Sequence, residues 1–218
     1  MTSSFSFSAG KAGIIGSVLA GVFFVTVVIF GFFQPGYNHL STSISTLVVG
    51  KYGWIQTVNF LVLALSFVFV GYGLGKQLTC KSVSGIFIAF VTVALSIVAI
   101  AFLPTDKLDP LQAFRFTMLS PIAKIHYVLV FLLLLLSPIL VIKLILVFWN
   151  EPKWRALVSL TIGICAFNFF FGLLWFYFLR IGFLLEWKGL FQKILAANVI
   201  LWLMVIGNRI RVIEQKEE

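Results

Sequence analysis

The sequence predicts an all-α membrane protein with six transmembrane helices, and three observations support this prediction. Of the 218 residues, 61% are hydrophobic and only 11% are charged, whereas about a quarter of the residues of a soluble domain are charged. Six apolar runs are each long enough to cross a bilayer, and only short polar segments separate them. A single soluble core could not bury this much apolar surface, so we expect it to face lipid.

The first predicted span covers residues 12–33, a continuous apolar run that reaches about 33 Å at about 1.5 Å per residue. Only Lys11 stands directly before it as a basic residue, and no small-residue cleavage site follows, so we expect a span rather than a cleaved signal. Pro35 and Gly36 end this helix. Apolar residues then recur at helical spacing over 40–48, which predicts a short interfacial helix between the first two spans.

The second and third spans are predicted at residues 55–75 and 85–103. Tyr52 and Trp54 stand just before the second span, where interfacial aromatic residues are common. Pro104 ends the third span.

The last three spans are predicted at residues 125–148, 156–179 and 190–207. Pro138 lies inside the fourth span and predicts a kink. The fifth and sixth spans carry one asparagine each, and such amides usually tie helices together. All six spans form a single domain over residues 1–218.

The distribution of charge indicates a membrane partner rather than nucleic acid. The net charge is +9, but the basic residues stand singly between apolar runs and form no basic face. Six spans place both termini on one side, and basic residues in the short loops of that side assign it to the cytoplasm. We therefore expect a multi-pass protein of the cell membrane, the inner membrane in bacteria.

The same threading brings the first, third and fifth loops to the opposite face, together with most of the chemically distinctive side chains. We expect a pocket at this outer face that binds a membrane lipid or lipid-like ligand. Basic side chains there would hold an anionic headgroup through charge-assisted hydrogen bonds. The predicted ligand-binding residues are Tyr37, Asn38, His39, Ser41, Arg115, Arg180, Glu186 and Lys188.

Catalysis at this face is the alternative. Ser45 as nucleophile, His126 as base and Asp106 as its orienting group are the residue types of a serine hydrolase. The bland interpretation of the same residues is that Ser45 and Asp106 satisfy helix ends and His126 bonds a neighbouring loop. A third hypothesis is a non-catalytic subunit that packs against a membrane-protein partner or a second copy of the chain.

Metal and haem chemistry have weaker support. Two histidines and Asp106 could supply three zinc ligands, but they lack paired spacing. Bis-histidine haem requires facing histidines within the helices, and His39 is in a loop. We therefore expect neither a metal site nor a cofactor.

Four short motifs resemble the domain of unknown function 998 (DUF998) family of six-span membrane proteins. The first loop reads Pro35-Gly36-Tyr37 and then Ile44-Ser45-Thr46-Leu47, where the family has an acidic residue in place of Thr46. The other three are Leu103-Pro104-Thr105-Asp106 after the third span, His126 at the start of the fourth, and Gly189-Leu190-Phe191-Gln192-Lys193 at the sixth. The resemblance implies fold and topology, and it implies no known reaction.

Overall fold

The computed structural model describes residues 7–79, 83–107 and 109–217, and the predicted all-α, six-span fold is confirmed. Within these residues there are six long helices and no strand, and each of the six is long and apolar enough to cross a membrane. They are α1 (Ala9–Phe33), α2 (Gly53–Gln77), α3 (Val83–Phe102), α4 (Pro121–Asn150), α5 (Val158–Ile181) and α6 (Lys188–Glu214).

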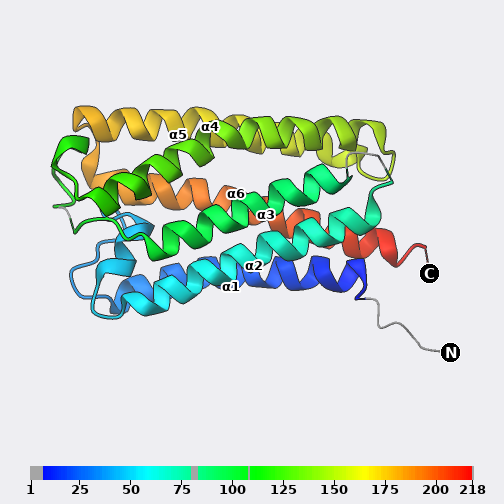
Figure 1. The fold of residues 1–218 in the computed structure, drawn as a ribbon, viewed down its shortest axis with the longest axis horizontal. Helices are drawn as coiled ribbons and strands as arrows, with labels where there is room; N and C mark the ends of the chain where they lie inside the picture. The colour runs from blue at the N-terminus through cyan, green and yellow to red at the C-terminus, as the bar shows by residue number, and fades with distance from the viewer. Residues whose placement is uncertain (1–6, 80–82, 108, 218) are drawn as a thin grey trace.

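The helices run up and down, so that the loops after α1, α3 and α5 gather at one end of the bundle (Figure 1). We call this the loop end. The start of α1 and the end of α6 lie together at the opposite end, where the backbone N–H of Gly10 donates to Glu214 Oε2 at 2.8 Å. This is the arrangement that the alternating threading predicts.

Several helices extend beyond the predicted spans, because a helix continues past the apolar boundary until a capping residue ends it. α4 begins at Pro121, where the Ser120 hydroxyl accepts the Ala123 N–H at 3.2 Å. Pro138 lies within the same helix and cannot donate to the Leu134 carbonyl. The Ser137 hydroxyl donates to that carbonyl instead, at 3.2 Å, so α4 remains continuous.

The short helix between the first two spans is the 3₁₀ helix η1 (Ile44–Val49). Ile44 and Leu47 point into the core, as the apolar pattern predicts. The helix begins later than that pattern suggests, because Leu40 lies in a preceding turn in which Asn38 Oδ1 accepts backbone N–H groups. Loop one therefore folds down over the bundle end and is not an independent surface helix.

Close packing of α1 against α6 and α2 forms the rigid part of the bundle. A Cβ atom at Gly13 would overlap the carbonyl oxygen of Gly207, so only glycine allows α1 and α6 to approach this closely. Ser66 on α2 donates its hydroxyl to the Gly16 carbonyl at 2.8 Å, and Asn59 Nδ2 donates to the Phe23 carbonyl at 3.0 Å. Small residues and interhelical hydrogen bonds are the usual means of helix association in a membrane.

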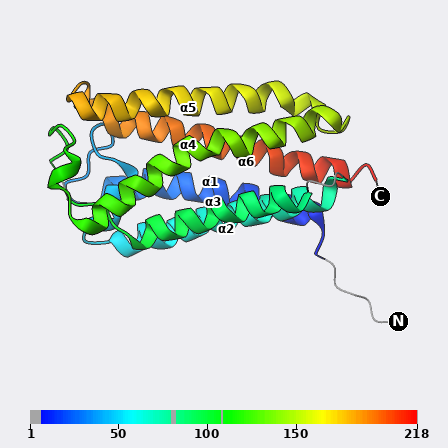
Figure 2. The same ribbon diagram turned by 45° about the horizontal axis from the view of Figure 1, so that its top comes forward.

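The α4–α5 hairpin packs less tightly. Only 6% of the apolar window of α4 is buried, against 50% for α2. Figure 2 shows α4 running obliquely from the end of α3 to the start of α5, with α5 along the outer edge of the bundle. Their attachment includes hydrogen bonds from Trp202 Nε1 to Thr161 Oγ1 at 3.2 Å and from Asn198 Nδ2 to the Ile164 carbonyl at 3.4 Å. The looser packing leaves space between the hairpin and the rest of the bundle.

Candidate functional site

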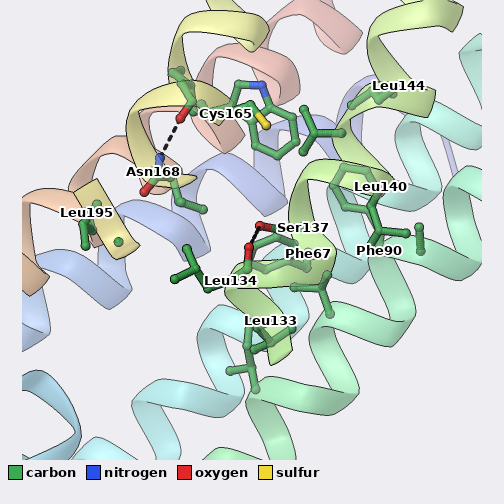
Figure 3. Close-up of a pocket in the computed structure, with 18 of the residues that line it drawn as sticks. Phe67, Phe90, Leu133, Leu134, Ser137, Leu140, Leu144, Cys165, Asn168 and Leu195 are labelled. Atoms are coloured by element: carbon green, nitrogen blue, oxygen red, sulfur yellow. Dashed lines mark hydrogen bonds between the residues drawn. The ribbon is translucent and has the colours of Figure 1, made fainter. Parts of the chain in front are cut away.

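A cavity of about 990 Å³ occupies the space between the α4–α5 hairpin and the rest of the bundle. Its walls come from all six helices and from η1, and most of the lining is apolar. Figure 3 shows Leu133, Leu140 and Leu144 of α4 beside Phe67 and Phe90. A volume near 1,000 Å³ lies at the upper end of small-molecule sites, so the space suits a large apolar ligand.

The cavity extends across most of the bundle. Its lining on α4 runs from His126 to Asn150, which corresponds to about 36 Å at about 1.5 Å per residue. The hydrocarbon core of a bilayer is about 30 Å thick. Leu146 also lines the cavity, and 58% of its surface is exposed.

Polar side chains interrupt the apolar lining at both ends and near mid-depth, and those at the end opposite the loop end include Ser84, Lys143, Asn150 and Glu151. Ser45, His126 and Gln192 line it at the loop end, and Ser137 and Asn168 line it near mid-depth. Each of the mid-depth pair bonds a carbonyl of its own helix, as the dashed lines in Figure 3 show. In the loop-end group, Gln192 and His126 are each held by a hydrogen bond from one of their two side-chain polar atoms.

The structure brings Ser45 and His126 to the same cavity, and both are more than nine-tenths buried. His126 Nδ1 lies 2.7 Å from the Leu103 carbonyl oxygen. A carbonyl oxygen only accepts, so Nδ1 carries the proton, and Nε2 of the neutral ring is left as an acceptor. The backbone carbonyl of Ile100 is a second acceptor close to this ring. No hydrogen bond from Nε2 or from the Ser45 hydroxyl to another described residue is observed.

Asp106 lies outside this cavity and is engaged elsewhere. Its carboxylate accepts the Ser120 backbone N–H at 2.8 Å and the Ser120 hydroxyl at 2.7 Å. It therefore fastens the third loop to the start of α4. His126 is oriented by the Leu103 carbonyl and not by Asp106. Within the described residues no hydrogen bond joins Ser45, Asp106 and His126, and their assignment as a catalytic triad stays a prediction.

Loop one is tied to the start of α6 by a set of hydrogen bonds centred on Lys193. The Lys193 side chain is 6% exposed, and its ammonium donates to the carbonyls of His39, Thr42 and Gly189 at 2.9, 3.1 and 3.3 Å. Gln192 Oε1 accepts the backbone N–H of Ile44 at 2.6 Å. A Cβ atom at Gly189 would overlap Thr42, so glycine permits this close contact.

Tyr37 and His39 pack beside this lysine. The Lys193 ammonium lies 5.0 Å from the centre of the Tyr37 ring, a distance typical of a cation–π contact. Burial raises the pKa of the Tyr37 hydroxyl. Burial, and then the charge of Lys193, lower the pKa of His39. Both side chains rest against Gly31 near the end of α1, and neither lines the large cavity.

The other predicted ligand-binding residues surround the loop end without reaching the large cavity. Ser41 and Lys188 line a small cleft of about 30 Å³ together with Asp106. Asn38 shapes the turn of loop one through its side-chain oxygen. Arg115, Arg180 and Glu186 are exposed. Within the residues that the structure describes, no three histidine, cysteine or acidic side chains gather as metal ligands would.

One known family matches most of the chain. The family described as "Protein of unknown function (DUF998)" matches residues 18–209. The chain belongs to the DUF998 family. No curated protein and no solved structure matches it.

The DUF998 motifs meet in space as two pairs. The motif of loop one contacts the Gly189–Lys193 motif through Gln192 and Lys193, and the Leu103–Asp106 motif contacts the start of α4 through His126. Sequence reasoning missed the part played by Lys193, because a lysine at the start of a span reads as an interfacial anchor. The signal was available, since Lys193 closes the Gly189–Lys193 motif directly after Gln192.

Proposed function

We propose that this DUF998 protein binds the apolar chain of a membrane lipid in the cavity between the α4–α5 hairpin and the rest of the bundle. The observation that carries the proposal is the cavity itself: about 990 Å³, lined mainly by apolar side chains along nearly the whole of α4. Apolar lining with a few placed polar groups is typical of a ligand site. We expect a lipid to enter from the bilayer beside Leu146, which lines the cavity and is exposed.

Filling the cavity tests this function. Ala89 and Ala196 line the cavity on α3 and α6, so the double variant Ala89→Phe, Ala196→Phe places two rings in the proposed lipid site. Native mass spectrometry of detergent-purified protein should detect retained lipid in the wild type and markedly less in the variant. Val25→Phe is the matched control, because Val25 on α1 is 54% exposed on the outer surface. Equal lipid retention by all three proteins would refute the proposal.

A lipid hydrolase is the second candidate, favoured by one observation: Ser45 and His126 line the same cavity. In this mechanism His126 Nε2 would take the Ser45 proton as the hydroxyl attacks an ester carbonyl. The ester C–O bond breaks, the leaving alcohol takes that proton, and water then hydrolyses the acyl-serine to free fatty acid and serine. The Leu103 carbonyl would hold the imidazole in the required tautomer. Release of fatty acid from a diacylglycerol by the wild type and not by Ser45→Ala would support this function. No release under matched conditions would reject it.

We also propose the cell membrane as the location, with both termini in the cytoplasm and the loop end outside. The basis is the set of basic residues in the short loops of the terminal side. A green fluorescent protein fused after the C-terminus should fluoresce, and alkaline phosphatase at the same position should be inactive. The reverse pattern would invert the proposed orientation.

A further inference from the structure

The loop end of the cavity presents three polar groups with unused hydrogen-bonding capacity. They are the Ser45 hydroxyl, Nε2 of His126, and the amide nitrogen of Gln192, which has no partner within the described residues while its oxygen is taken by Ile44. Ser45 and His126 are 7% and 2% exposed. Because all three residues line the cavity, a ligand bound there would supply partners for these atoms.

The chemistry of these atoms defines the group that would satisfy them. His126 Nε2 accepts a hydrogen bond, so it requires a ligand donor such as a hydroxyl. The amide nitrogen of Gln192 donates and requires an acceptor oxygen. The Ser45 hydroxyl can do either. A hydroxyl next to a carbonyl or ether oxygen meets all three requirements.

Formal charge is missing from this end of the lining. The charged side chains that line the cavity are Lys143 and Glu151, which lie about 25 Å or more from His126 along α4. Lys193 directly follows Gln192, but its ammonium already donates hydrogen bonds to three backbone carbonyls. A phosphate buried here would meet no cation from the cavity lining, and an unpaired buried charge is strongly disfavoured.

We propose that the ligand is a lipid with an uncharged, hydroxyl-bearing head, and that this head lies among Ser45, His126 and Gln192. The inference rests on the proposed lipid-binding function and adds the class and the orientation of the ligand. The apolar chains extend from the loop end toward mid-depth, along Leu133 and Leu140. The anionic headgroup expected from the exposed arginines is replaced by a neutral one.

Two lipids that differ only at the head test the proposal. Dioleoylglycerol and dioleoylphosphatidic acid carry the same chains, and the second adds a phosphate. Purified protein in phosphatidylcholine nanodiscs is titrated with each, and bound lipid is measured by native mass spectrometry. We expect dioleoylglycerol to bind at least about tenfold more tightly.

Single substitutions of the proposed head-binding residues test where the lipid head lies. Ser45→Ala and His126→Phe should each weaken dioleoylglycerol binding by about threefold to tenfold, the usual effect of one lost hydrogen bond. Ser45→Ala keeps the test decisive if His126→Phe fails to fold. Ser96→Ala is the control, because the Ser96 hydroxyl bonds Thr92 within α3 and lies outside the cavity.

The outcomes separate the two proposals. Equal or tighter binding of phosphatidic acid, or dioleoylglycerol binding that is the same in wild type and Ser45→Ala, overturns the neutral-head inference and leaves lipid binding in place. Binding of neither lipid, together with equal lipid retention in the cavity-filled variant, overturns both.

Discussion

The ammonium of Lys193 on α6 donates to the backbone carbonyl of His39 in loop one at 2.9 Å, across 154 positions of sequence. Two further carbonyls complete its surroundings, so a buried charge is paired with oriented dipoles rather than with a carboxylate. This contact holds loop one against the bundle end. Ser45, which follows in η1, reaches the cavity because the loop is held there.

The first prediction concerns this lysine. Lys193→Met keeps most of the apolar stem of the side chain but removes three hydrogen bonds and leaves the carbonyls unpaired. We therefore expect a loss of about 2 kcal/mol in the free energy of unfolding. Thermal unfolding in detergent measures the loss, with Lys216→Met in the exposed C-terminal turn as control. Equal melting temperatures for both variants would show that loop one is held by other contacts.

The second prediction concerns the α1–α6 contact. Gly13→Ala should destabilise the protein, because the added methyl group would overlap the Gly207 carbonyl. Gly163→Ala should be neutral or stabilising by up to about 1 kcal/mol, since helical alanine is favoured over glycine and nothing lies within 4 Å of its Cβ. Thermal unfolding compares the two directly. A Gly13→Ala protein as stable as Gly163→Ala would contradict the close approach of these helices.

The third prediction assigns a structural part to Asp106. Asp106→Ala and Ser120→Ala should each lower the free energy of unfolding by about 1–2 kcal/mol, because each removes a hydrogen bond at the start of α4. The double variant should cost clearly less than the sum, since the partners act on one contact. A strictly additive double-mutant cycle would mean that the two residues do not act together.

The fourth prediction is a pH dependence from His39. Its pKa is lowered by burial and by Lys193, so the folded protein binds fewer protons than the unfolded chain. Stability from this residue is fully present above the ordinary pKa of about 6.5 and is lost as the pH falls through the lowered value. His39→Gln should therefore show a smaller drop in melting temperature between pH 7 and pH 5 than the wild type. An equal or larger drop would reject this source of pH dependence.

The sequence was sufficient for the six spans and for the gathering of three loops at one end, because both follow from apolar run lengths and alternate crossing. It also indicated that the asparagines inside the fifth and sixth spans tie helices together. Asn198 does so, whereas Asn168 bonds the Ile164 carbonyl of its own helix. The partner of His126 was not predictable, since any of several loops could reach a histidine at the start of α4. The structure assigns this contact to the Leu103 carbonyl.

The position of the cavity could not be predicted from the sequence, for a physical reason. Residues such as Leu133 and Leu140 have the same apolar character whether they face lipid, a neighbouring helix or an internal space. The distinction depends on how closely the α4–α5 hairpin packs against the other helices. The pattern of apolar residues in the sequence does not determine that distance between helices. The predicted site was consequently placed among the exposed polar residues of the loops, while the main cavity lies between the helices.

Photo-crosslinking tests the central claim most directly. The protein is prepared in membranes that contain a diacylglycerol with a diazirine in its acyl chain, and the crosslinked peptides are identified by mass spectrometry. We expect adducts on the cavity residues Leu133, Leu140 and Phe90, and their loss in the Ala89→Phe, Ala196→Phe variant. Adducts confined to outward-facing positions such as Val18 and Val25, unchanged in that variant, would contradict a lipid site inside the bundle.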